Sequence, residues 1–305
     1  MGCNDIYEKA RLFIYRNARP VELALWRFHF EGGAKEDVLR ALAAYQNLDG
    51  GFGHALEADS FNPNSAPIQT WNAASILRQI GFEDGSHPVI KGILRYLDSG
   101  ADFSEEHGQW LNTVKSNDSY PHAIWWNYSE NEDAFRYNPT AYLAGFILRF
   151  ADKGSGLYKK AEKIAVRAYK WFIANIPCGD AATKCFLGLY EYLTEAGTEL
   201  VDMDGFADKL REAVNADICR DSGKWGVEYV CQPSAFIRSK DSMFYEGNEE
   251  LVKKECELIA SSQLEDGSYN LPWVWCNDYK EYTLAANWWK SVQLIEKMRF
   301  LKEFC

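Results

Sequence analysis

The chain has 305 residues, of which 47% are hydrophobic and 15% aromatic, and its net charge is −11. This apolar content is enough for a packed core, and the acidic balance argues against nucleic acid or an anionic membrane as a partner. No apolar run approaches the ~18–20 residues that span a bilayer, so we expect no membrane span. The first residues lack the basic and apolar regions of a signal peptide, and none of the eight cysteines forms a Cys-x-x-Cys motif. We therefore expect reduced thiols and a cytoplasmic protein.

Apolar periodicity and capping residues predict helices along most of the chain. In the N-terminal half these cover 4–17, 20–31, 34–47, 66–80, 86–97 and 105–114. The C-terminal half adds 139–152, 156–176, 180–196, 203–218, 247–263 and 283–303. The stretch 226–246 is ambiguous and could hold a short extended segment at 227–230. No Pro-, Gly- or Ser-rich linker interrupts the series, so we predict a single all-α domain over residues 1–305.

A turn of sequence Gln-x-x-Asp-Gly occurs twice, in residues 46–53 (QNLDGGFG) and 263–269 (QLEDGSY). In each copy a helix ends, the chain reverses at Asp-Gly and an aromatic residue follows. The Asp side chain can bond to its own backbone, and the Gly can take the positive φ that a tight turn needs. We expect these turns to be structural, with the bonds made by Gln46, Asp49, Gln263 and Asp266.

Residues 117–120 and 221–225 look like degenerate copies of the same turn, because each has an Asp, small or polar residues and then an aromatic. Three of the four turns precede a helix that begins with Thr and small residues, at Thr70, Thr140 and Thr283; the turn at 221–225 has no such helix. A helix–turn–helix unit cannot bury its own apolar face, so the copies must stack.

This repeat resembles that of squalene–hopene-type terpenoid cyclases and protein prenyltransferase β-subunits, and the resemblance covers four turns spread over most of the chain. It implies an (α/α)6 toroid, in which inner helices ring a central cavity and outer helices run back. The predicted helices are enough for six inner–outer pairs. The resemblance does not carry the chemistry, because a fold hosts many functions.

The catalytic motifs of both families are missing. The Asp-x-Asp-Asp acid of cyclases has its nearest match in residues 202–205 (DMDG), which read as a helix start. The single Asp-x-Cys, in residues 217–219 (DIC), is followed by Arg220 and not by the Tyr that the prenyltransferase zinc motif requires, and residues 130–133 (ENED) replace a diphosphate-binding Asp-Asp-x-x-Asp poorly. We predict no metal and no cofactor.

Candidate chemistry lies in the loop after the first turn. His54 comes two residues after the turn aromatic Phe52, and His122 comes two residues after Tyr120. If the turns are equivalent, both imidazoles open a loop that leads to an inner helix. His54, Glu57 and Asp59 could then perform acid–base chemistry or, less well supported, bind a metal. The alternative is that the histidines bond to loop backbone and the carboxylates cap a helix or face solvent.

Aromatic residues concentrate in two long loops, one of which also carries His122. Aromatic faces stabilise cations and apolar ligands and stack on sugar rings, although the same rings could simply plug one end of a toroid. The predicted substrate-binding residues are His122, Trp125, Trp126, Tyr128, Trp273 and Trp275.

We predict an enzyme of the terpenoid-cyclase/prenyltransferase-like class, a lyase, isomerase or transferase, that binds a partly apolar small molecule. His54, Glu57 and Asp59 would transfer protons. A carbohydrate-active toroid, either a polysaccharide lyase or a glycosidase with an oligosaccharide ligand, is the second hypothesis, since hydrolysis needs two carboxylates and elimination a base. A non-catalytic binding scaffold is the third.

Overall fold

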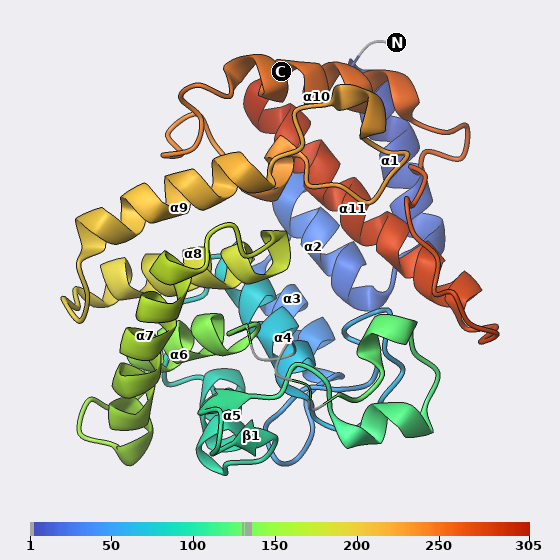
Figure 1. The fold of residues 1–305 in the computed structure, drawn as a ribbon. Helices are drawn as coiled ribbons and strands as arrows, with labels where there is room; N and C mark the ends of the chain where they lie inside the picture. The colour runs from blue at the N-terminus through green and yellow to red at the C-terminus, as the bar shows by residue number, and fades with distance from the viewer. Residues whose placement is uncertain (1–2, 130, 132–135) are drawn as a thin grey trace. The chain divides into compact units, whose positions relative to one another are not determined.

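The computed structural model describes residues 3–129, 131 and 136–305, and it is mainly α-helical, which confirms the all-α expectation. The described residues divide into two compact units: unit 1 comprises residues 3–42 and 215–305, and unit 2 comprises the described residues between 43 and 214. The helices, shown in Figure 1, are α1 Cys3–Asn17, α2 Pro20–Phe30, α3 Lys35–Ala43, α4 Pro67–Gln79, α5 Pro88–Asp98, α6 Thr140–Phe150, α7 Gly156–Ala174, α8 Asp180–Ala196, α9 Met203–Asp217, α10 Glu249–Ser262 and α11 Tyr282–Phe304.

Most predicted helix ends agree with the structure within two residues, because local capping sets them. Pro20 begins α2, Ser155 accepts a hydrogen bond from the Tyr158 amide at the start of α7, and Gly197 ends α8 in the left-handed conformation. The helix predicted at 34–47 is the exception, since α3 ends at Ala43 and the chain enters the first turn early.

The helix predicted at 105–114 is wrong. The chain instead forms a hairpin, in which β1 (Phe103–Ser104) pairs antiparallel with β2 (Gln109–Trp110). Gly108 has φ +63°, and a Cβ there would lie 2.3 Å from the Arg167 guanidinium. The helix prediction missed this hairpin, in which Gly108 O accepts a hydrogen bond from Arg167 of α7 at 3.3 Å.

In unit 2, α6 is the most buried helix and packs against α7 and α8 (Figure 1). All residues from Thr140 to Leu148 are buried. Small residues permit the close approach: a Cβ on Gly145 would lie 3.1 Å from the α-carbon of Leu189, and a Cβ on Gly188 would lie 2.1 Å from the Tyr142 ring. Small residues thus bring these neighbouring helices close together.

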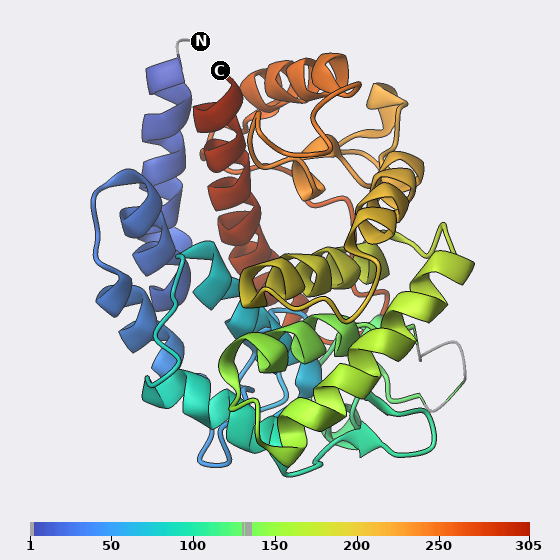
Figure 2. The same cartoon turned by 90° about the vertical axis from the view of Figure 1, so that its left-hand side faces the viewer.

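In unit 1, α11 packs against α1, α2 and α10, and Figure 2 shows α1 and α11 side by side. The ambiguous stretch 226–246 forms turns and one short 3-10 helix, η5 (Pro233–Ala235), with no strand at 227–230. The turn at 221–225 therefore has no long helix after it, as expected. Neither unit by itself tests the prediction that residues 1–305 form a single toroid domain, so this stays a prediction.

None of the helices in the described ranges is long and apolar enough to cross a membrane. The poor match to a diphosphate-binding motif at residues 130–133 lies outside the described residues, apart from Asn131.

Candidate functional site

The two Asp-Gly turns make the same glutamine bonds. Gln46 Nε2 donates to the carbonyl oxygen four residues on, at 3.0 Å, and to Val89 O of α5, at 3.2 Å. Gln263 Nε2 also donates to the carbonyl four residues on, at 3.0 Å, and to Ile6 O of α1, at 2.9 Å. Each glutamine thus fixes its own turn and ties it to a neighbouring helix.

The turn aspartates also act alike. Asp49 Oδ1 accepts from the amide two residues on, at 2.9 Å, and from the Ser65 hydroxyl, at 2.7 Å. Asp266 Oδ1 accepts from the amide and hydroxyl of Ser268, at 2.9 and 2.7 Å. Partial burial alone would raise the pKa of Asp266, but these two bonds outweigh it and lower the pKa. The bonding of all four turn residues is that expected of structural groups.

The turns dock on their helices in the same register. Gly50 has φ +98° and Gly267 φ +91°, and a Cβ on either would lie 2.1 Å from Gly92 O or 2.2 Å from Lys9 O, respectively. Gly92 follows Val89 in α5 by the same three positions as Lys9 follows Ile6 in α1. Thus α1, the first helix of the chain, holds the last turn as α5 holds the first.

The third equivalent turn lies at Gly108-Gln109-Trp110, and not at residues 117–120 as predicted. The Phe52 amide donates to Thr70 Oγ1 at 3.1 Å, and the Trp110 amide donates to Thr140 Oγ1 at 2.9 Å. The sequence signal was a shared Gly-x-aromatic pattern, present at 50–52, 108–110, 223–225 and 267–269. The position equivalent to His54 is therefore Asn112. The prediction that His122 occupies the equivalent position in the repeat is wrong.

His122 nevertheless lies beside the first loop. Residues Ser60 and His122 form an isolated antiparallel bridge, with the Phe61 amide donating to Pro121 O and the Ala123 amide to Asp59 O, both at 2.9 Å. We call residues 54–62 and 120–127 the paired loops. They join two stretches that the sequence places far apart.

The His122 ring is buried and bonded on both sides. Its Nδ1 lies 2.6 Å from Tyr120 O, and its Nε2 lies 2.7 Å from Asn127 Oδ1. A ring held at both nitrogens fixes the loop, so the loop-bonding alternative describes His122 better than a ligand contact does. Asn127 was not singled out from the sequence, which gives no signal for such a contact.

The His54 side chain is exposed, and it bonds to the first turn and not to Glu57 or Asp59. Its Nε2 lies 2.9 Å from Asn47 Oδ1, on the first turn. Both His54 and Ala55 have left-handed backbones, with φ +59° and +60°. Such conformations are uncommon outside glycine and occur often at functional loops.

Glu57 and Asp59 are buried, with 5% and 3% of their surfaces exposed. Glu57 Oε2 accepts from Asn72 Nδ2 of α4 at 2.8 Å, and Glu57 Oε1 lies 3.4 Å from the Asp59 amide. The bend between them, which two-residue spacing requires, is present, because the Ser60 amide donates to Glu57 O. Buried carboxylates are rare unless they are bonded or functional, so this pair is the strongest part of the site.

An apolar cluster lies at the start of α4. Trp71, Leu111 and Trp126 pack against a buried group of residues, Ala66, Ile68 and Val114. The indole nitrogens of Trp71 and Trp126 are buried and have no hydrogen-bond partner among the described residues; the same holds for Asn112 Oδ1. Unsatisfied buried polar atoms are few in native proteins and call for a physical explanation. Trp71 and Asn112 were missed, although Trp71 adjoins the Thr70 of the repeat.

The other predicted aromatics divide between the two units. Trp125 is 41% exposed on η2 (Ile124–Trp126), and the amide of Tyr128 donates to Asp118 Oδ1 at 3.0 Å, in unit 2. Trp273 and Trp275 belong to unit 1; Trp275 is buried, and Trp273 contacts Trp289 edge-on at 5.5 Å. Trp275 is thus a core residue.

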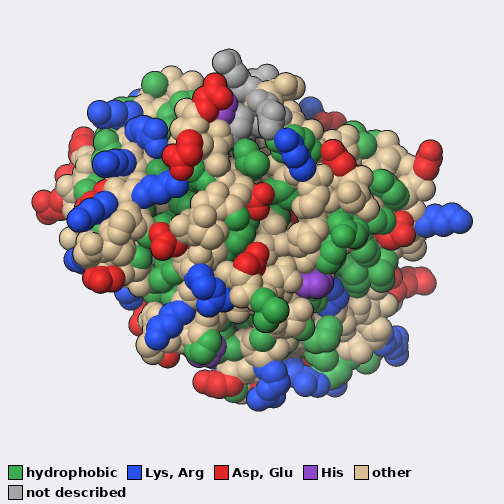
Figure 3. All heavy atoms as spheres, turned by 90° about the horizontal axis from the view of Figure 1, so that it is seen from below, with side chains coloured by type: hydrophobic (Ala, Val, Ile, Leu, Met, Phe, Trp, Pro, Cys, Tyr) green, Lys and Arg blue, Asp and Glu red, His purple; other side chains and the backbone are tan. Residues whose placement is uncertain are grey.

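Within the described parts of the chain, no three His, Cys, Asp or Glu side chains come close enough to hold a metal ion. On the face seen in Figure 3, acidic, basic and hydrophobic side chains are interspersed.

The chain was compared with models of protein families, with curated proteins and with solved structures, and none of the three comparisons finds a match.

Proposed function

We propose that the chain forms the (α/α)6 toroid expected from its repeats and that it is an enzyme of the terpenoid-cyclase/prenyltransferase-like class. The toroid is supported by the shared register of the two turns. A closed ring requires a first helix that completes the last repeat, and α1 meets the last turn through the same glutamine bond and the same close glycine contact that α5 makes with the first.

The ligand would bind at the start of α4. Its apolar part would lie against Trp71, Trp126 and Leu111, and its oxygen atoms would accept from the two indole N–H groups that have no partner among the described residues. This combination of an apolar surface and unused donors is the observation that carries the proposal. It fits a partly apolar, oxygen-bearing molecule such as an isoprenoid alcohol or its diphosphate.

Glu57 would transfer the proton. It reaches α4 at Asn72, the residue that follows Trp71, and it is buried where a carboxyl group can hold or release a proton beside an apolar ligand. Asp59, whose amide adjoins Glu57, would support the same chemistry. His54 faces the turn at Asn47 and is left out of this step.

The test uses intrinsic tryptophan fluorescence with an isoprenoid alcohol, its diphosphate and a neutral oligosaccharide as probes. We expect saturable quenching by an isoprenoid. Trp126→Phe removes one indole N–H and should weaken isoprenoid binding by about 3–10-fold, the contribution of one hydrogen bond. The control is Trp125→Phe, which changes the exposed neighbouring ring and should alter isoprenoid binding by less than about 2-fold.

Glu57→Gln keeps the bond to Asn72 and removes the proton. The variant should bind the isoprenoid as wild type does and should lower the rate at which the isoprenoid is turned over by about 10²–10⁴-fold. Equal binding by Trp126→Phe and wild type would contradict the proposed site.

A carbohydrate-active protein is the second candidate, favoured by exposed rings that could stack on sugars. Trp125 is one, and in unit 1 the 70%-exposed Tyr229 contacts Trp273 edge-on at 5.7 Å. Saturable binding of the oligosaccharide but of no isoprenoid would favour this candidate, and binding of neither would favour a scaffold.

A further inference from the structure

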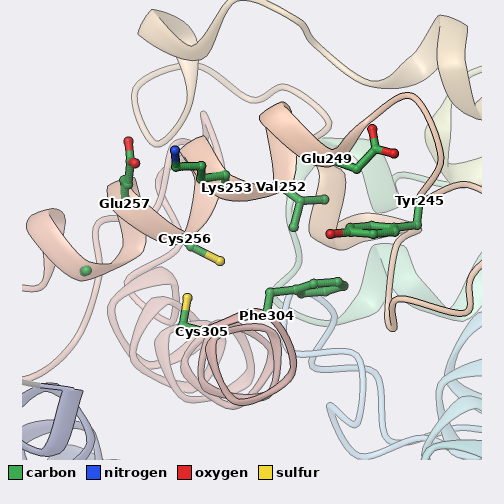
Figure 4. A pocket seen from close by; sticks show the side chains of 9 residues that line it. Tyr245, Glu249, Val252, Lys253, Cys256, Glu257, Phe304 and Cys305 are labelled. Atoms are coloured by element: carbon green, nitrogen blue, oxygen red, sulfur yellow. The ribbon is translucent and has the colours of Figure 1, made fainter.

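Two cysteines face each other across a groove in unit 1. The groove has a volume of about 290 Å³ and lies between α10 and the end of α11. Its wall includes the stacked rings of Tyr245 and Phe304, whose centroids are 5.5 Å apart. Figure 4 shows the sulfur atoms of Cys256, on α10, and Cys305, directly after α11, pointing toward one another.

The two thiols differ in how much of their surface is exposed to solvent. Cys256 is buried, with 7% of its surface exposed, whereas Cys305 is exposed. Burial raises the pKa of the Cys256 thiol, and a hydrogen bond to Cys305 raises it further, so Cys256 keeps its proton and directs it at the Cys305 sulfur. An oxidant in solution therefore meets Cys305 first.

The backbone holds this arrangement in place. The Cys305 amide donates to Leu301 O at 2.9 Å, which continues the helical bonding of α11. The sulfurs of five other cysteines, Cys178, Cys185, Cys219, Cys231 and Cys276, lie within 3.3–3.7 Å of oxygen atoms instead. The facing thiols at the groove are thus a distinct feature of α10 and α11.

We propose that Cys256 and Cys305 form a dithiol site that reacts with small soluble disulfides and closes to an intramolecular disulfide across the groove. The Cys305 thiolate attacks one sulfur of the oxidant, which releases the other half as a thiol and leaves a mixed disulfide. Cys256 then loses its proton to solvent and attacks the Cys305 sulfur, which releases the second half. Two protein S–H groups are oxidised to one S–S bond, and the oxidant's disulfide is reduced to two thiols.

The experiment treats the intact protein with oxidised glutathione and maps its thiols by mass spectrometry after alkylation and digestion. We expect loss of two thiols per chain, a peptide linked between Cys256 and Cys305, and reversal by dithiothreitol. Oxidation should also raise the denaturant midpoint of unfolding, because the new bond ties the end of α11 to α10.

Single variants separate the two steps. Cys256→Ser should stop at a stable glutathione adduct on Cys305, and Cys305→Ser should give neither adduct nor link at this site. Cys276→Ser, which changes another exposed cysteine of unit 1, should behave like wild type. As a measurement that needs no variant, phenylarsine oxide, which bridges neighbouring thiols, should protect both cysteines from alkylation.

A wild-type chain that retains the glutathione adduct without forming the link, a link that joins two chains, or a failure of phenylarsine oxide to protect the pair would overturn the proposal. None of these outcomes bears on the ligand proposed for α4, since the groove lies in unit 1 and that site in unit 2.

Discussion

At the scale of single residues, Asp102 places a carboxylate in a partly buried position of unit 2. Burial raises the pKa of Asp102, the hydrogen bond from Tyr96, 2.8 Å long, opposes this, and the charge of Asp49 adds to the increase. The net effect is a raised pKa, so the ionised form is less favourable in the folded chain than in the unfolded one. The backbone of Asp102 is left-handed, with φ +54°, which Asn also tolerates.

We therefore predict that Asp102→Asn stabilises the protein near pH 7, where the wild-type carboxylate is ionised. An acid with a raised folded-state pKa gains stability as the pH falls through that pKa, so the advantage of the variant should shrink toward about pH 4. Urea unfolding at both pH values measures the difference. An advantage that is equal or larger at the lower pH would refute this assignment.

At the scale of elements, the turns depend on glycines in contact with helix backbones. Gly50 lies against α5 and Gly267 against α1, and both have positive φ. Gly32, which follows α2, also has positive φ, at +70°, but a Cβ there would meet nothing within 4 Å. Substitution at Gly32 tests only the free-energy cost of a left-handed backbone. Substitution at Gly50 or Gly267 adds the cost of a steric clash with a helix.

We predict that Gly32→Ala costs about 1–2 kcal/mol, the penalty of a left-handed alanine. Gly50→Ala and Gly267→Ala should each cost about 1–3 kcal/mol more, because the methyl group must displace a helix carbonyl. Chemical denaturation of the three variants gives the comparison. Equal losses at all three positions would mean that the turns do not dock as described.

At the scale of the whole molecule, the N-terminal helix belongs to the C-terminal repeat. Gln263 donates to Ile6 O across 257 residues of sequence, and Asn287 Nδ2 donates to Asn17 O at the other end of α1. A terminal helix that only lay on the surface would open independently of the rest.

Amide hydrogen exchange followed by mass spectrometry tests this directly. We predict that the central amides of α1, from Ala10 to Ile14, are protected as strongly as those of α11 and exchange together with them. Exchange of the whole of α1 at the rate of an unstructured terminus would contradict the closure that the proposed toroid requires.

The sequence by itself determined most of the helices and the two Asp-Gly turns. Pro20 and Gly197 act on their own neighbours, and Asp266 bonds to a residue two positions away, so these features can be read from short stretches. Glu57 and Asp59 were singled out because a loop with two carboxylates after a turn is visible in the sequence, and their catalytic role stays a prediction.

Only the tertiary structure decided which residues meet across long separations. Trp110 bonds to Thr140, which makes the hairpin the third turn, and His122 lies beside Ser60 rather than at the position equivalent to His54. Cys256 and Cys305 likewise face each other because α10 packs on α11. Such contacts depend on how distant helices pack, and local periodicity and capping contain no information about that packing.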